Sequence, residues 1–107
     1  MTIPLIFLLL AYRLKMIRSN IATWNVRTFQ TPSAREEAVC LMQRHQILVL
    51  ALTETHEKQF VTTELAEGLN YCSTASNRGI GGVGFIIDRK TVFTFSPVSE
   101  RLATLRL

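Results

Sequence analysis

Residues 47–52 read ILVLAL, six apolar residues in succession. A strand carries apolar side chains on both sides only when both faces of its sheet are covered, so this stretch predicts a central strand. The segment IATWNV before it, residues 21–26, is rich in residues that favour a pleated, buried setting. It predicts a second strand, and that strand ends beside two polar residues, Asn25 and Arg27.

A helix is predicted between these two strands. Ser33 and Glu36 have the spacing of a capping box, and apolar residues recur on one helical face after them. The pattern predicts a helix over about residues 34–45. A strand, a helix and a second buried strand in this order indicate a β-α-β unit with parallel strands.

The second half of the chain predicts mostly strands. Residues 62–68 are expected to form a short helix that Gly68 ends. LNYCSTAS (69–76) and VGFIID (83–88) predict strands, with VFTFS (92–96) as the antiparallel partner of the latter. RLATLRL (101–107) predicts a last strand at an open edge. The fold class is therefore α/β: a β-α-β unit followed by antiparallel strands.

The composition indicates one small domain with incomplete covering. The chain has 107 residues, of which 48% are hydrophobic and 19% charged, against about 25% charged in typical soluble domains. The formal net charge of +4 permits attraction to a polyanion without requiring it. Cys40 and Cys72 have no zinc-site spacing and are expected to be two buried free thiols in a reducing compartment.

Residues 1–19 form an apolar leader. Its apolar run, Ile3–Tyr12, is ten residues long, shorter than the roughly 20 that a membrane-spanning helix needs. The basic residues Arg13 and Lys15 follow the run, the reverse of the order in a signal peptide. A signal peptide, a short membrane-surface anchor and a translated leader outside the fold all stay open. The localisation is unknown, with an intracellular protein favoured over a secreted one and membrane association not favoured.

A candidate metal site lies after the two central strands. Glu54 stands two positions past ILVLAL, and Asn25 stands at the same end of the earlier strand. Open α/β sheets bind ligands at the carboxyl ends of their strands. If the two strands are parallel neighbours, a carboxylate and an amide oxygen meet there and suit a divalent cation. The alternative, that Asn25 caps a turn and Glu54 is solvated, stays open.

Four segments resemble a known family. IATWNVRTF, ILVLALTETH, GGVGFIID and SERLATLRL are similar, in this order, to the opening segments of the endonuclease/exonuclease/phosphatase superfamily. That superfamily includes deoxyribonuclease, abasic-site endonucleases and the endonuclease domains of non-LTR retrotransposons, and the pattern is most similar to retroelement-type, craniofacial development protein-like sequences. The resemblance implies that residues 20–107 form the N-terminal half of a four-layer α/β sandwich with metal-dependent phosphodiesterase activity.

The resemblance also implies roles for individual residues. Glu54 matches the glutamate that binds magnesium (or manganese), and Asn25 matches the asparagine that organises that site. Arg27, His56 and Arg101 are implied to face the substrate, a nucleic acid in the intact family member, with solvated charges as the alternative for both arginines. Thr53 stands where the family usually has glutamine.

The family's remaining catalytic groups have no counterpart in this chain. An Asp-x-Asn pair, a Tyr or His and a final Asp-His are absent, and the single aspartate, Asp88, begins no such motif. The first hypothesis is therefore a catalytically incomplete fragment of a magnesium-dependent endonuclease-like domain, with a weak metal site. The alternative is an inactive retroelement remnant or truncated gene product, and a weaker third is a small membrane-associated protein. The coding sequence beyond Leu107 would discriminate the first two. Self-association is expected because a second sheet to cover ILVLAL and VGFIID is missing.

Overall fold

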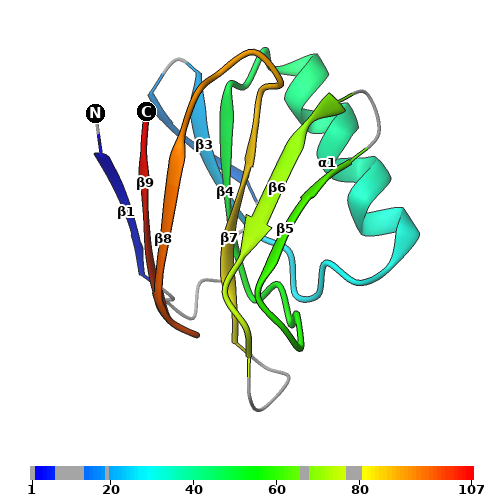
Figure 1. The fold of residues 1–107 in the computed structure, drawn as a ribbon. Helices are drawn as coiled ribbons and strands as arrows, with labels where there is room; N and C mark the ends of the chain where they lie inside the picture. The colour runs from blue at the N-terminus through cyan, green and yellow to red at the C-terminus, as the bar shows by residue number, and fades with distance from the viewer. Residues whose placement is uncertain (1, 7–13, 19, 66–67, 77–80) are drawn as a thin grey trace.

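The computed structural model describes residues 2–6, 14–18, 20–65, 68–76 and 81–107, which form an α/β fold (Figure 1). Within them lie one helix and nine strands arranged as two sheets. The elements are β1 (Thr2–Ile6), β2 (Leu14–Arg18), β3 (Ile21–Asn25), α1 (Pro32–Arg44), β4 (Val49–Thr53), β5 (Val61–Glu64), β6 (Asn70–Ser73), β7 (Val83–Ile87), β8 (Thr94–Ser99) and β9 (Leu102–Arg106).

The larger sheet has the predicted β-α-β unit at its centre. Its strand order is β2-β3-β4-β7-β6-β5. Strands β3 and β4 are parallel and joined through α1, whereas all the other pairs are antiparallel. Every residue of β4 is buried. The predictions of a central strand in ILVLAL and of a parallel β-α-β unit are confirmed.

Helix α1 begins earlier than the sequence predicted. Thr31, not Ser33, is the N-cap, and its hydroxyl oxygen accepts a hydrogen bond from the Ala34 amide at 3.2 Å. Proline suits the first helical position because its φ is already helical and its missing amide needs no partner there. Pro32 therefore fixes the start of the helix, and the capping-box prediction at Ser33 is wrong.

The helix predicted over residues 62–68 is wrong for residues 62–64, which belong to a strand, and residues 66–67 lie outside the described residues. Residues Val61–Glu64 form β5, which pairs antiparallel with β6. Three β-branched residues in succession, VTT, lose rotamer freedom in a helix and suit a pleated strand. The neighbouring strand supplies the hydrogen bonds that a short isolated helix would lack, so β5 forms.

The last two strands belong to a second, smaller sheet. Strand β8 was predicted to pair with β7, but it pairs with β9, and β9 also pairs with β1. The order β1-β9-β8 places β9 in the middle, so both the predicted partner of β8 and the open edge at β9 are wrong. The connection after β7 turns at Asp88, whose carboxylate accepts from the Lys90 amide at 3.2 Å. This turn leads the chain from one sheet to the other.

Two parts of the leader take part in these sheets. Residues 2–6 pair with β9, and residues 14–18 pair with β3. Residues 1, 7–13 and 19 lie outside the described residues, so most of the apolar run of the leader does too. In the described part of the chain, no helix is long and apolar enough to cross a membrane.

The elements form three layers, with α1 on one face of the larger sheet and the smaller sheet on the other (Figure 1). Apolar residues of α1 pack against Leu50, Leu52 and Ile86 on the first face. On the second face, Ala103 and Leu105 of β9 cover the other side of β4 and β7.

The smaller sheet covers the face of β4 and β7 that α1 leaves free. The expectation that the faces of ILVLAL and VGFIID lie open is wrong, because every residue of β4 and β7 is buried. Phe60, Val92 and Val98 are 53%, 88% and 64% exposed, and β5 and β8 are at sheet edges. Self-association through these features stays a prediction.

Candidate functional site

The carboxyl ends of β3 and β4 lie side by side. Asn25, the last residue of β3, is the register partner of Thr53, the last residue of β4. The pairing continues beyond the strands, because the Val26 amide donates to the Thr53 carbonyl oxygen at 3.1 Å. Asn25 is buried and Glu54, which follows Thr53, is half-buried. The fold therefore brings an amide and a carboxylate to one edge of the sheet.

Three of the predicted site residues have left-handed backbone conformations. Arg27, Glu54 and His56 each have a φ of 58°. Residues other than glycine adopt this region at a cost of about 1–2 kcal/mol, and they keep it where their surroundings impose it. The His56 amide donates to the Gly81 carbonyl at 2.9 Å, and the His56 carbonyl accepts from Gln30 Nε2 at 2.6 Å. These bonds fix the loop that carries Glu54.

A close approach of backbone to side chain supports the same loop. Thr55 is fully buried, and its hydroxyl shares a 2.7 Å hydrogen bond with the Ser73 hydroxyl of β6. Gly82 has a φ of 97°, and a Cβ atom there would collide with Thr55 Oγ1. Only glycine fits both demands, so Gly82 is part of the loop's support.

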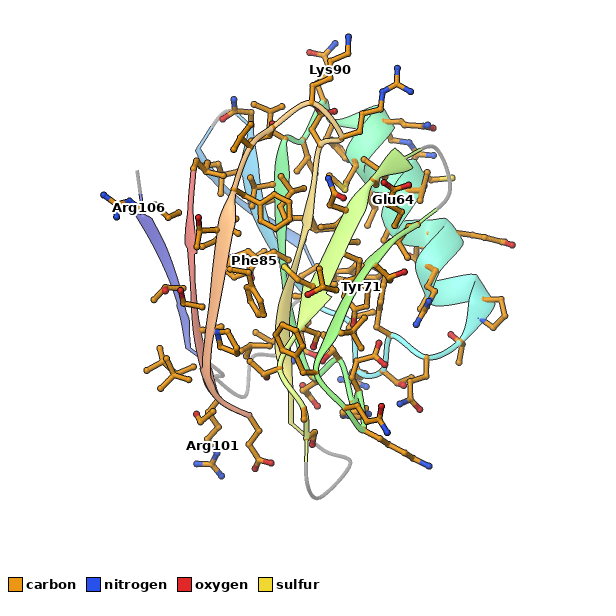
Figure 2. The ribbon with its side chains drawn as sticks, viewed as in Figure 1. Glu64, Tyr71, Phe85, Lys90, Arg101 and Arg106 are labelled. Carbon is orange, nitrogen blue, oxygen red and sulfur yellow. The ribbon has the colours of Figure 1, made fainter. Side chains whose placement is uncertain are left out.

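Arg101 lies at this end of the molecule as well. It occupies the turn between β8 and β9. The backbone carbonyl of the preceding residue, Glu100, accepts a hydrogen bond from the Gly82 amide at 2.8 Å. Figure 2 shows Arg101 at the lower end, where the loop from β3 to α1 also lies. Both Arg27 and Arg101 are exposed. The fold thus gathers at one end of the sheets the five predicted positions, which are Asn25, Arg27, Glu54, His56 and Arg101.

A shallow pocket adjoins Asn25. Its volume is about 200 Å³, and Arg27 and the first turn of α1, with the Thr31 cap, line it. Glu37 also borders this pocket, so its charge is mixed rather than purely positive.

Other residues with catalytic chemistry are at the opposite end. The Asp88 amide donates to the carbonyl of Leu48, which precedes β4, at 2.9 Å. His45 is the C-cap of α1 and leads into the same strand from that side. Neither residue can serve the edge where Glu54 lies.

Comparisons with known proteins leave the family untested. No protein-family model, curated protein or solved structure matches this chain. The resemblance to the endonuclease/exonuclease/phosphatase superfamily therefore rests on the four sequence segments and stays a prediction.

A partly buried charged cluster near the site was not predicted from the sequence. Glu57 is 7% exposed, and its Oε2 accepts a hydrogen bond from the Tyr71 hydroxyl at 2.6 Å. Arg35 Nη2 lies 3.4 Å from the same oxygen, and Arg35 Nε donates to the Phe29 carbonyl at 2.9 Å. The Glu57 carbonyl accepts from the Ser76 amide at 2.7 Å. The cluster joins the loops after β3 and β4 to α1 and β6.

The same cluster keeps the tyrosine protonated. Burial raises the pKa of Tyr71 well above its ordinary value, and the hydrogen bond to Glu57 raises it further. Arg35 also lies over the Phe29 and Tyr71 rings, 5.4 and 5.7 Å from their centroids. Arg35 and Glu57 are 22 residues apart in sequence, and Glu57 and Tyr71 are 14 apart, so no short motif links them.

A divalent cation at this end of the sheet stays a prediction. Glu54 would supply one carboxylate to it and Asn25 one amide oxygen, and magnesium would keep several water ligands of its own. Within the described ranges, no three Asp, Glu, His or Cys side chains gather into a metal-binding group. Thr53 Oγ1 and His56 Nε2, on either side of Glu54 in sequence, are buried polar atoms with no hydrogen-bond partner in the part of the chain that is described.

Proposed function

We propose that the chain is the N-terminal part of a magnesium-dependent phosphodiesterase of the endonuclease/exonuclease/phosphatase type. The observation that carries the proposal is the parallel pairing of β3 and β4, with Asn25 and Glu54 at its carboxyl end. The four-segment resemblance supplies the family. A helix layer and two facing sheets are compatible with three of the four layers expected of such a sandwich.

In this proposal, each site residue has a limited task. Glu54 and Asn25 hold the cation, and manganese can replace magnesium because both prefer oxygen ligands. When bound, the cation polarises a phosphoryl oxygen and stabilises the charge that develops on it. The left-handed backbone at Glu54 sets the direction in which its side chain leaves the chain, which reduces the ordering that cation binding requires.

The substrate is proposed to be a nucleic acid. Arg27, which follows β3, and Arg101, in the turn between β8 and β9, are exposed cations at the end of the molecule that carries Glu54, where they can contact backbone phosphates. His56 is in the loop after Glu54. Phosphate contacts of this kind fix the position of a nucleic acid without reading its sequence.

Nucleic-acid binding can be tested by fluorescence anisotropy with a labelled duplex over a range of salt concentrations. Arg27→Ala and Arg101→Ala should each lower affinity and reduce the salt slope by about one unit. Arg106→Ala is the matched control, because Arg106 is exposed and pairs with Thr2 and Thr94 at the opposite end of the smaller sheet. Equal losses in all three variants would show a nonspecific charge effect and contradict the proposed binding face.

The chain itself is proposed to be catalytically incomplete. Asp88 and His45 lie at the far end of the sheet, so no described aspartate or second histidine can act as base beside Glu54. This observation favours the second candidate function, an inactive remnant that keeps only the fold and a weak cation site. The two candidates predict the same result for this chain and differ only in the coding sequence that follows Leu107.

The experiment on activity uses supercoiled plasmid and abasic-site DNA with magnesium. We expect no cleavage, because losing one proton-transfer group typically costs a factor of about 10² to 10⁴ and several are missing. Magnesium-dependent nicking that survives stringent purification and disappears in Glu54→Gln would overturn the statement that the chain is incomplete.

The experiment on the metal site measures manganese binding by water-proton relaxation. Wild type should bind weakly, and Glu54→Gln should abolish this binding. Glu64→Gln is the matched control, since Glu64 is an exposed carboxylate on β5, in register with the far end of the sheet. Binding that is lost in Glu64→Gln and kept in Glu54→Gln would contradict the proposed function.

A further inference from the structure

Strand β5 presents an open edge of the larger sheet. It is the last strand in the sheet order, and in the described part of the chain it pairs only with β6. The Leu65 amide donates to the Leu69 carbonyl at 2.7 Å, which continues the register of these two strands. Register partners in an antiparallel pair alternate between those that exchange hydrogen bonds and those that do not. Thr63, two positions before Leu65, therefore bonds toward β6, and the backbone N–H and C=O groups of Thr62 and Glu64 point to the open edge.

The residues of β5 distinguish it from the other edge strands. Strands β1 and β8 contain Pro4 and Pro97, which have no amide hydrogen to donate to a further strand. Strand β2 carries the basic residues Lys15 and Arg18. Proline and basic side chains are common features of edges that resist pairing. Strand β5 reads VTTE, with neither kind of residue, so among the edges of the two described sheets it is the least protected against an added strand.

A groove of about 670 Å³ lies between the end of β5 and α1. Glu64 and Leu65 line it on the sheet side. Val39 of α1 and Leu65 are half-buried and pack against the core, so the groove has an apolar floor. The helix residues that line the groove lie on one face of α1, and they are Pro32, Arg35, Glu36, Val39, Cys40 and Gln43.

The charge of this groove is acidic. Glu36 and Glu64 are exposed, and Glu64 borders the groove at the end of β5 (Figure 2). Arg35, the one cation among the described lining residues, already contacts Glu57 at 3.4 Å. Because the chain as a whole has a formal net charge of +4, this edge attracts basic residues that most of the surface repels.

We propose that β5 binds an extended peptide segment of another protein as an additional strand, and that this segment alternates apolar and basic residues. Hydrogen bonds to the backbone of Thr62 and Glu64 hold such a strand, and the groove beside the edge selects its alternate side chains. Apolar side chains enter the groove beside Val39 and Leu65, and basic side chains reach Glu36 and Glu64. This role does not depend on the proposed phosphodiesterase site.

The charge preference is tested by fluorescence anisotropy with two labelled hexapeptides, Lys-Val-Lys-Val-Lys-Val and Glu-Val-Glu-Val-Glu-Val. The full chain should bind the lysine peptide at least about tenfold more tightly than the glutamate peptide. Glu64→Lys should reduce this preference about 3- to 10-fold. Glu37→Lys is the matched control, because Glu37 is exposed on the same helix but does not line the groove. Equal binding of the two peptides by wild type, or equal effects of the two substitutions, would overturn the proposal.

The backbone contact is tested in the wild-type chain by amide hydrogen exchange followed by NMR, so the result does not depend on a variant that folds. The Thr63 amide should exchange slowly with or without peptide, because it bonds toward β6. The amides of Thr62 and Glu64 should exchange rapidly alone and at least about tenfold more slowly when the lysine peptide is saturating. Peptide binding that leaves these two amides fast would overturn the added strand. Slow exchange before peptide is added, relieved by dilution, would show that a second copy of the chain occupies the edge and would also overturn the proposal.

Discussion

Removing the Tyr71 hydroxyl should show how much the Arg35–Glu57–Tyr71 cluster contributes to the free energy of unfolding. In Tyr71→Phe, the 2.6 Å hydrogen bond to Glu57 is lost, and a carboxylate that is only 7% exposed keeps Arg35 alone, at 3.4 Å. A hydrogen bond to a charged group contributes about 1.5–3 kcal/mol. Because a small domain has only about 5–15 kcal/mol in total, this single change removes a large share of the stability.

The assay is urea and thermal unfolding followed by circular dichroism. For a domain of this size, 1 kcal/mol corresponds to about 4–8 °C in Tm, so we expect Tm to fall by about 6–24 °C. Thr63→Val is the matched control, because Thr63 is exposed and pairs with Tyr71 on the neighbouring strand. Its effect should stay within about 0.5 kcal/mol. A Tyr71→Phe variant as stable as the control would refute the reasoning.

The same variant has a predicted pH dependence. Burial and Glu57 raise the pKa of Tyr71 in the folded state above the ordinary value of 10.0 that applies in the unfolded state. The unfolded chain therefore loses this proton first, and the contribution of Tyr71 to stability is complete below pH 10.0 and declines above it. The difference in unfolding free energy between wild type and Tyr71→Phe should shrink from pH 9 to pH 11. A difference that stays constant or grows over this range would contradict the assignment.

Three further predictions concern the fold. Gly82→Ala should destabilise the protein by more than about 2 kcal/mol, since a positive φ costs about 1–2 kcal/mol and the new Cβ collides with Thr55 Oγ1. Gly68→Ala, with a φ of 75° and the flexible Arg89 side chain as the nearest contact among the described residues, should cost less in urea unfolding, and the reverse order would be inconsistent with the loop geometry. Of the two free thiols, exposed Cys40 should react rapidly with a disulfide reagent, whereas burial, which raises the pKa of Cys72 to about 12, should protect Cys72 until the chain unfolds. Two equally fast thiols in wild type, or one fast thiol in Cys40→Ser, would contradict the structure. Sedimentation velocity should show concentration-dependent self-association. Val98→Lys should reduce it, because Val98 is exposed on the edge strand β8. A wild-type protein that stays monomeric at all concentrations would contradict this prediction.

The first half of the fold could be predicted because its signals are local. ILVLAL is apolar without interruption, and the chain between it and the earlier strand has helical periodicity, so the β-α-β unit followed from the pattern alone. The location of Asn25 and Glu54 at the carboxyl ends of neighbouring strands followed from parallel pairing. The capping-box spacing at Ser33 predicted the wrong cap, because the Thr31-Pro32 pair before it is the stronger start signal.

The second half could not be predicted in the same way, because its strands choose partners by tertiary packing. Residues 61–64 form a strand because β6 offers an edge to them. Strand β8 does not pair with β7. It joins the smaller sheet, whose apolar residues are buried against the second face of β4 and β7. The pairing of β1 with β9 joins residues about one hundred positions apart. Both cysteines were expected to be buried, yet Cys40 is exposed on α1, where a small apolar residue can lie on either face.

The position of Asn25 and Glu54 at the same end of neighbouring strands could be predicted, but the contacts that support the loop around them could not. Arg27, His56 and Arg101 lie at the same end of the molecule, and their roles there stay predictions. The left-handed conformations of Glu54 and His56 had no glycine to signal them. The Arg35–Glu57–Tyr71 cluster joins residues that only the folded chain brings together.

The most direct test of the proposed cation site is a manganese titration followed by amide NMR. Paramagnetic broadening falls steeply with distance from the ion, so it locates a bound cation on the chain. We predict that the amide signals of Asn25, Thr53 and Glu54 broaden first in wild type and that Glu54→Gln abolishes this selective broadening. Broadening that starts instead at the exposed helix acids Glu36 and Glu37, or that is unchanged in Glu54→Gln, would contradict a cation site at the carboxyl end of β3 and β4.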